Sequence, residues 1–265
     1  MDHEITVRVS FFLGIFLLLL LGELWKPRRV LVIPKKERWF NNLSIMVINT
    51  LLVRFLFPLV PVGMALLARE RGWGLLQYLE FPYLLHVAGA VIVLDFVVYL
   101  QHVLFHAVPP LWRFHIMHHV DLDLDVTSGM RFHPIEILLS MGIKLLAIGL
   151  LGPPALAVII FEIVLNGTSM FNHSNIFIPL TMDRFLRLFI VTPDMHRVHH
   201  SVILKETKSN YGFALPWWDW LLGTYRAQPA KGHQGMTIGN SRFLDEKRQK
   251  LWWLLLFLPF SNKAH

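Results

Sequence analysis

The chain has 265 residues, of which 54% are hydrophobic and only 16% are charged, and its mean hydropathy is positive at +0.49. This balance excludes an ordinary soluble protein and favours a polytopic membrane protein with a water-facing part. The net charge of +7 comes without a long basic run interleaved with aromatics, so it does not indicate nucleic acid binding, and the absence of cysteine excludes disulfides, zinc fingers and thiolate iron–sulfur centres.

Three apolar runs in the first part of the chain predict membrane helices. The first, residues 10–25, follows "MDHEITVRVS", which lacks the basic start of a signal peptide, so we expect an uncleaved spanning helix. The second, residues 43–68, contains Pro58 and Pro61 and should be kinked or locally unwound. The third covers residues 83–104, and its only interruptions are His86, Asp95 and Gln101.

A fourth apolar region, residues 135–165, contains the breaker "GPP" at 152–154. The breaker should divide the region into two shorter helices that form a membrane hairpin. The last apolar run, "LWWLLLFLPF" at 251–260, is too short to span and is expected at the interface. The sequence therefore predicts an all-α polytopic membrane protein with about four or five membrane helices.

The charges in the loops orient these helices. The loop after the first helix has six basic residues against one acid, and the positive-inside rule places residues 26–42 in the cytoplasm. The helices that follow then bring residues 102–134, and everything from 166 onward, to the same side. Nearly all the histidines lie in these two stretches, so we expect a cytosolic helical cap that carries them.

Eight of the 14 histidines fall in three short boxes, "HVLFH", "HIMHH" and "HRVHH". On a helix, positions i, i+3 and i+4 share a face, so each box is predicted to aim its imidazoles at one point. Eight histidines are more ligands than one four- to six-coordinate ion can take, so the number predicts a centre with two metal ions. The boxes are His102 and His106; His115, His118 and His119; and His196, His199 and His200.

The choice of ligands narrows the choice of metal. Neutral imidazole suits iron, zinc, copper or nickel, whereas a structural zinc site normally includes cysteine. The chain has no H-E-x-x-H string, and the acids near the boxes are aspartates instead of the glutamates of a ferritin-like site. An all-histidine, two-metal site at a membrane edge points to iron handling dioxygen. Those aspartates are Asp121, Asp123, Asp125 and Asp194.

At these residues the sequence resembles the fatty acid hydroxylase/sterol desaturase superfamily of integral membrane non-haem di-iron oxygenases. The family pattern of H-x3-4-H, H-x2-H-H, an isolated histidine and a final H-x2-H-H reads here as "HVLFH", "HIMHH", "NHSN" and "HRVHH". Two further stretches, "RFHPIE" and "NYGFALPWWDWLLGTYRAQP", resemble its bacterial sterol-desaturase branch. The resemblance covers roughly residues 83–235. We expect residues 1–265 to form a single domain, in which residues 1–82 contribute two N-terminal membrane helices.

The resemblance implies two iron ions held by the eight box histidines. His173 is similar to a further ligand, although relatives often have another histidine four residues earlier, where this chain has Ser169. His133 is either a ligand or the cap of the helix that follows it. Zinc can replace iron in a recombinant protein, because imidazole affinity favours Zn2+ over Fe2+. The candidates for side chains that support the ligands are Asp95, Tyr99, Asn172 and Asp194.

The leading interpretation is an O2-dependent lipid hydroxylase or desaturase in the bacterial inner membrane, with its active site on the cytoplasmic face. No dinucleotide-binding or Cys-rich segment supplies a reductant, so electrons should come from a separate carrier protein. A candidate docking site for this carrier is the positive surface near Lys205, Lys208 and Arg226. One alternative is a zinc-dependent membrane hydrolase, and a second is a histidine-rich metal transporter.

An interfacial aromatic belt is the expected role of Trp217, Trp218 and Trp220. The substrate, the regiochemistry, ether cleavage as a further reaction and the oligomeric state stay open.

Overall fold

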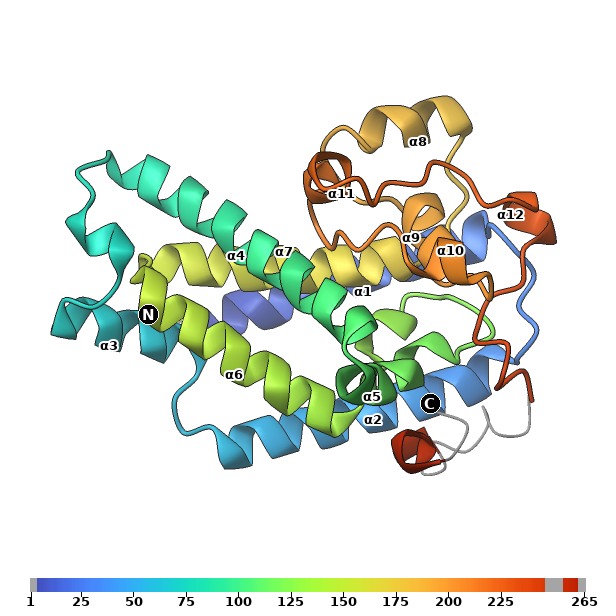
Figure 1. Ribbon diagram of the computed structural model, residues 1–265, viewed down its shortest axis with the longest axis horizontal. Coiled ribbons are helices and arrows are strands. Elements are labelled where there is room, and N and C mark those ends of the chain that lie inside the picture. Colours follow the sequence, from blue (N-terminus) through green and yellow to red (C-terminus); the bar gives the residue numbers. More distant parts are fainter. Residues whose placement is uncertain (1–3, 246–254, 262–265) are drawn as a thin grey trace.

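The computed structural model describes residues 4–245 and 255–261, and every regular element in these ranges is a helix (Figure 1). This confirms the all-α fold. The longer helices are α1 (Glu4–Trp25), α2 (Lys35–Leu56), α3 (Pro61–Arg71), α4 (Tyr83–Ala107), α5 (Pro109–His119), α6 (Pro134–Leu151) and α7 (Ala155–His173). The short ones are η1 (Leu75–Tyr78), η2 (Ser128–Met130), α8 (Leu180–Leu186), α9 (Pro193–His199), α10 (Leu204–Thr207), α11 (Trp217–Leu221), α12 (Gly232–Gly235) and η3 (Leu258–Phe260).

Five segments of the described chain are long and apolar enough to cross a membrane, as the sequence predicts. They contain α1, α2 together with α3, α4, α6 and α7. The predicted kink in the second span is present, because α2 ends at Leu56 and α3 begins at Pro61. Proline suits this first helical position, since its missing N–H would have no partner within the helix.

The "GPP" breaker separates α6 from α7, as expected. Gly152 ends α6 in the left-handed conformation, with φ of 60°, and a Cβ there would clash with the carbonyl oxygen of Trp73. Glycine is therefore required at this turn. Beyond it, α7 continues to His173 instead of ending near residue 165, so this longer helix ends on a histidine.

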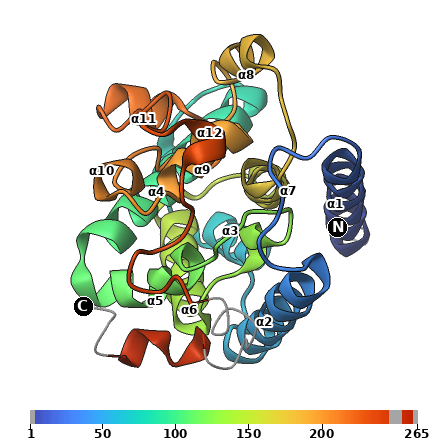
Figure 2. The same ribbon diagram turned by 90° about the vertical axis from the view of Figure 1, so that its right-hand side faces the viewer.

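The long helices pack side by side, and the short helices α8 to α12 gather at one end of them (Figure 1). Figure 2 shows the molecule from that end, with α1 and α2 on one side and α8 and α11 at the top. The helix α7 contacts α1, α3, α4 and α9, so it links the spans to the cap. An apolar cluster joins α3, α4, α6 and α7 through Val62, Ala65, Leu94, Ile148, Val158 and Phe161.

A buried network of charged side chains fixes the segment between α5 and α6. Arg38, in the first turn of α2, donates to Asp125 at 2.8 Å and also pairs with Asp121. Burial raises the pKa of Asp121, but Arg38 and Arg131 outweigh that effect and hold the pKa below its usual value. The segment that follows the second histidine box is thus anchored to the start of α2.

The C-terminal apolar run is described only in part. Residues 251–254 of the predicted interfacial segment lie outside the described residues. Leu255 and Leu258 are buried in a cluster with Ile116 and Met117 of α5. This part of the run therefore packs against α5, the helix that carries the second histidine box.

Candidate metal centre

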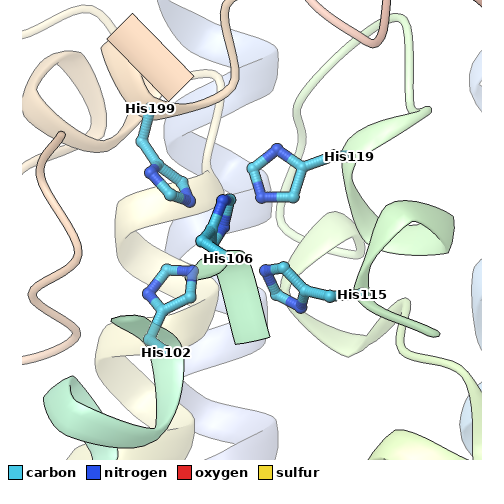
Figure 3. Close-up of side chains that lie close together, drawn as sticks. All are labelled: His102, His106, His115, His119 and His199. Carbon is cyan, nitrogen blue, oxygen red and sulfur yellow. The ribbon is translucent and has the colours of Figure 1, made fainter. Parts of the chain in front are cut away.

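Nine buried histidine rings form two groups where the ends of α4, α5, α7 and α9 meet. The rings of the first group point into one shared space (Figure 3). In each group, one ring nitrogen from every histidine lies within 4.8 Å of the others. The first group is His102, His106, His115, His119 and His199, and the second is His118, His173, His196 and His200.

The two H-x2-H-H boxes each divide between the groups, which corrects the prediction that each box aims at one point. His115 and His119 face the first group, whereas His118 faces the second. In α9 the division is reversed, because His199 belongs to the first group and His196 to the second. The physical reason is that neighbouring residues on a helix point about 100° apart, so only the i and i+4 rings share a direction.

Hydrogen bonds outside the first group fix how its rings are protonated. The Nδ1 atom of His102 lies 2.8 Å from the carbonyl oxygen of Tyr211, and that of His199 lies 2.7 Å from the carbonyl oxygen of Ser209. Since a carbonyl only accepts, Nδ1 must donate, which leaves Nε2 with a free lone pair in the neutral ring. Both Nε2 atoms are buried without a partner among the described residues, as a metal ligand would be.

The spacing of the ring nitrogens in the second group also fits a cation. His118 donates from Nδ1 to the carbonyl oxygen of Arg131, and His173 donates from Nδ1 to that of Ser169. In the neutral rings, both Nε2 atoms are then lone pairs, yet they lie only 3.0 Å apart. The Nε2 of His196 lies 3.1 Å from that of His173. With metal–nitrogen bonds of about 2.1 Å, ligands at right angles would be about 3.0 Å apart, so a bound ion fits this spacing.

Five of the rings are held in the neutral form that binds metal. Burial, followed by the charges of neighbouring rings, lowers the pKa of His118, His119, His196 and His200 well below the ordinary value. Burial lowers the pKa of His199 to about 3. Two all-nitrogen donor sets, of five and four rings, therefore fit two transition-metal ions.

Two of the predicted supporting residues, Asp95 and Tyr99, contact the loop beside the centre. Among the described residues, Asp95 bonds to no histidine ring. Its carboxylate accepts from the backbone N–H of Leu215 at 3.2 Å and from the indole N–H of Trp218 at 2.8 Å. The hydroxyl of Tyr99 bonds to that of Thr224 at 2.9 Å. This corrects the expectation that Asp95 orients a histidine, since nearer N–H groups occupy its oxygens.

The other two also support the surrounding backbone. Asn172 donates from Nδ2 to the carbonyl oxygen of Phe213 at 3.0 Å. Asp194 accepts from Arg28 at 2.9 Å and pairs with Arg197, so it ties the loop after α1 to α9. The rings of the two groups are positioned through these segments, and among the described residues neither Asp194 nor Asn172 bonds directly to a ring of either group.

His133 lies outside both groups and caps α6. Its Nδ1 accepts from the backbone N–H of Ile135 at 3.1 Å, and its Nε2 lies 3.2 Å from the carbonyl oxygen of Leu256. Of the two roles that the sequence leaves open for His133, the structure shows the helix cap.

Sequence reasoning missed Glu136, which lies in the first turn of α6. Its Oε1 is 2.7 Å from Nδ1 of His115, and the carboxylate is buried. A buried acid at the start of an apolar helix, within the quoted stretch "RFHPIE", was the signal that could have found it.

Comparisons with known proteins agree with this geometry. The fatty acid hydroxylase family model matches residues 87–224, more than half of the chain, and this region contains all nine rings. An ornithine lipid hydroxylase from Rhizobium tropici is 33% identical over 70% of this chain and 53% of its own. A Delta(7)-sterol-C5(6)-desaturase from Nicotiana tabacum is 26% identical over 54% of this chain and 51% of its own. An alkylglycerol monooxygenase from Homo sapiens is 28% identical over 64% of this chain and 38% of its own.

The chain thus spans about half, or less, of the length of these curated relatives. No solved structure shows a significant match to it.

Proposed function

The chain belongs to the fatty acid hydroxylase family, and from this premise we propose that it is an O2-dependent oxygenase that hydroxylates or desaturates a membrane lipid with two iron ions. The observation that carries the proposal is the pair of buried all-histidine groups beside apolar helices. The name of each of the three relatives includes a class of lipid. The reactions in the names differ, because one relative is a hydroxylase, one a desaturase and one a monooxygenase. We therefore propose a lipid substrate without choosing among these reactions.

The nine rings would hold the two ions, five around one and four around the other. When bound, iron supplies the activation of dioxygen and takes up external electrons. The protein's part is to keep the rings oriented and dry. The carbonyl oxygens of Tyr211 and Ser209 hold protons on the outer nitrogens of two rings, and no ring in either group is more than 8% exposed.

Aromatic side chains form walls around the rings and exclude water. Phe132 stacks on His118 with ring centroids 4.4 Å apart, and Phe213 lies beside His102 at 5.6 Å. Exclusion of water protects an oxidising centre from side reactions. It also supplies the apolar surroundings that a hydrocarbon chain requires.

We place the centre on the cytoplasmic side of a bacterial inner membrane. The basic loop after α1 supports this placement, because Arg28 contacts Asp194 and Arg29 donates to the carbonyl oxygen of Met236. The loop expected to be cytoplasmic and the cap thus share one side. These contacts also support residues 1–265 as one functional unit.

Electrons would come from a separate carrier protein, for which the exposed Lys205 and Lys208 offer a positive docking site.

The test is lipid mass spectrometry of cells that express the chain under 18O2, with the His196→Ala variant as the inactive control. We expect a lipid that gains one labelled oxygen atom or loses two hydrogen atoms, only with the unmodified chain. Unchanged lipids in cells whose purified protein contains iron would overturn the proposal. Turnover without O2 would instead favour the alternative, a zinc-dependent membrane hydrolase.

A further inference from the structure

Two short helices of the cap expose large apolar side chains. On and just after α8, Met182, Phe185 and Phe189 are 56%, 61% and 57% exposed. On and just after α11, Trp220, Leu221 and Leu222 are 39%, 74% and 53% exposed. We call these six residues the α8–α11 platform. Exposed apolar surfaces of this kind mark contact with a protein or a membrane.

The platform is tied to the side of a membrane span. The indole N–H of Trp217 in α11 donates to the carbonyl oxygen of Leu188, which joins the two short helices. The indole N–H of Trp218 donates to Asp95 of α4. Because Asp95 lies 12 residues before the end of α4 at Ala107, the attachment is about 18 Å along the helix from that end. The platform therefore lies alongside the span instead of beyond it.

The platform continues the lipid-facing surface of α4. Phe96, next to Asp95, packs against Trp218 with ring centroids 4.7 Å apart. On the same helix, Ile92, Val93 and Leu100 are exposed as side chains that would face lipid. Figure 1 shows α8 and α11 together on the α4 side of the molecule. A surface continuous with a lipid-facing helix is expected to lie in the edge of the bilayer.

The charges of these two helices also fit a membrane. Asp183 is buried and pairs with Arg187 at 2.7 Å, and Asp219 is buried and accepts from the backbone N–H of Tyr211. Arg184, in contrast, is exposed on α8. Apolar and tryptophan side chains with an exposed cation suit the interface of a bilayer with anionic headgroups.

We propose that the α8–α11 platform inserts into the lipid–water interface on the side of the membrane where the histidine centre lies. The segment between the two helices includes α9 and the loop that holds His102 and His199 through Tyr211 and Ser209. Insertion would place this segment where a lipid chain can reach it, a consequence that rests on the proposed function. The insertion itself does not depend on catalysis.

The absence of cysteine makes a direct test possible. Single-cysteine variants Phe185→Cys and Leu221→Cys of the full chain would carry nitroxide labels in nanodiscs of phosphatidylcholine and phosphatidylglycerol. Leu18→Cys, on the exposed face of α1, is the control within the bilayer. Lys231→Cys is the control in water, because Lys231 is exposed and directly precedes α12. The helix α12 lies at the outer end of the cap (Figure 1).

We expect the labels at 185 and 221 to collide more often with O2 than with a water-soluble nickel chelate, as the label at 18 does. The label at 231 should show the reverse. Nickel accessibility at 185 and 221 equal to that at 231 would overturn the proposal. So would concentration-dependent spin–spin broadening at 185 and 221, since it would mean that a second copy of the chain covers the platform. The labels report depth without turnover, so the insertion and the lipid oxidation can fail separately.

Discussion

The Nδ1 atom of His115 lies 2.7 Å from a carboxylate oxygen of Glu136, whereas His102 and His199 place Nδ1 against backbone carbonyls. A charged acceptor pulls more strongly on the ring proton than a neutral carbonyl does. The carboxylate is therefore expected to fix the orientation of the His115 ring more firmly than the carbonyls fix the other two rings. In the second group, the Nδ1 atoms of His118 and His173 bond to carbonyl oxygens. The carboxylate partner of His115 therefore distinguishes the first group.

Replacement of Glu136 should weaken metal binding at the first group. We expect Glu136→Gln to lower the affinity there about tenfold to hundredfold, because the amide accepts the hydrogen bond without the charge. Competition with a chelator, followed by metal analysis, measures the change. Glu80→Gln is the control, since Glu80 is exposed and remote. Equal affinities in Glu136→Gln, Glu136→Ala and the control would exclude a role for the carboxylate.

The histidine boxes and the helix breakers were predictable because they are local. The spacing in "HIMHH" and the turn at Gly152 depend on residues close together in the chain. The partner of Glu136 was not predictable, because its contact with His115 depends on how α6 folds back beside α5. Helix geometry separates the i+3 ring of each box from the i and i+4 rings, but which group each ring joins depends on how α5 faces α9, and a helical period alone does not specify that.

Single ligand losses should remove one ion at a time. We expect His119→Ala to lose the ion of the first group and His173→Ala to lose that of the second, because each removes a nitrogen from only one group. Metal analysis of the purified proteins should show about half of the unmodified content. His86→Ala, far from both groups in sequence, should keep full content. Complete loss in both variants would mean that the groups do not bind independently.

His133 should matter for stability but not for metal content. His133→Ala removes the side chain that accepts from Ile135 at the start of α6, and loss of such a cap costs about 0.5–2 kcal/mol. We expect a lower thermal midpoint with unchanged metal content. His133→Asn should restore much of the midpoint, since asparagine caps well. A loss of metal at an unchanged midpoint would instead identify His133 as a ligand.

The metal-free protein should lose stability in mild acid. Burial lowers the pKa of His199 from 6.5 to about 3, so its ring stays neutral in the folded state while it protonates in the unfolded state. Below pH 6.5 the unfolded state binds more protons, so stability falls as the pH drops from 6.5 toward 3. Each pH unit should cost up to about 1.4 kcal/mol for each such ring.

Thermal midpoints of the metal-free protein across this pH range test the effect. His199→Gln cannot protonate at this position, so its midpoints should fall less steeply with acid. A slope identical to that of the unmodified protein would show that His199 does not contribute.

Arg38 should hold the second histidine box in place from outside the centre. Arg38→Met leaves the buried carboxylates of Asp121 and Asp125 without their main cation, and such a loss typically costs about 3–5 kcal/mol. Because Asp121 follows His119 by two residues, we also expect reduced metal content at the first and second groups. Thermal unfolding and metal analysis measure the two effects. Arg54→Met, an exposed position on the same helix, is the control.

Arg38→Lys distinguishes charge from geometry at this position. Lysine keeps the charge but lacks the planar fork that lets one guanidinium reach both Asp121 and Asp125. We expect a midpoint between those of Arg38→Met and the unmodified protein. If Arg38→Met unfolds at the same temperature as Arg54→Met and keeps its metal, the buried network does not position the centre, and α5 must be held by its packing against α4, α6 and η3.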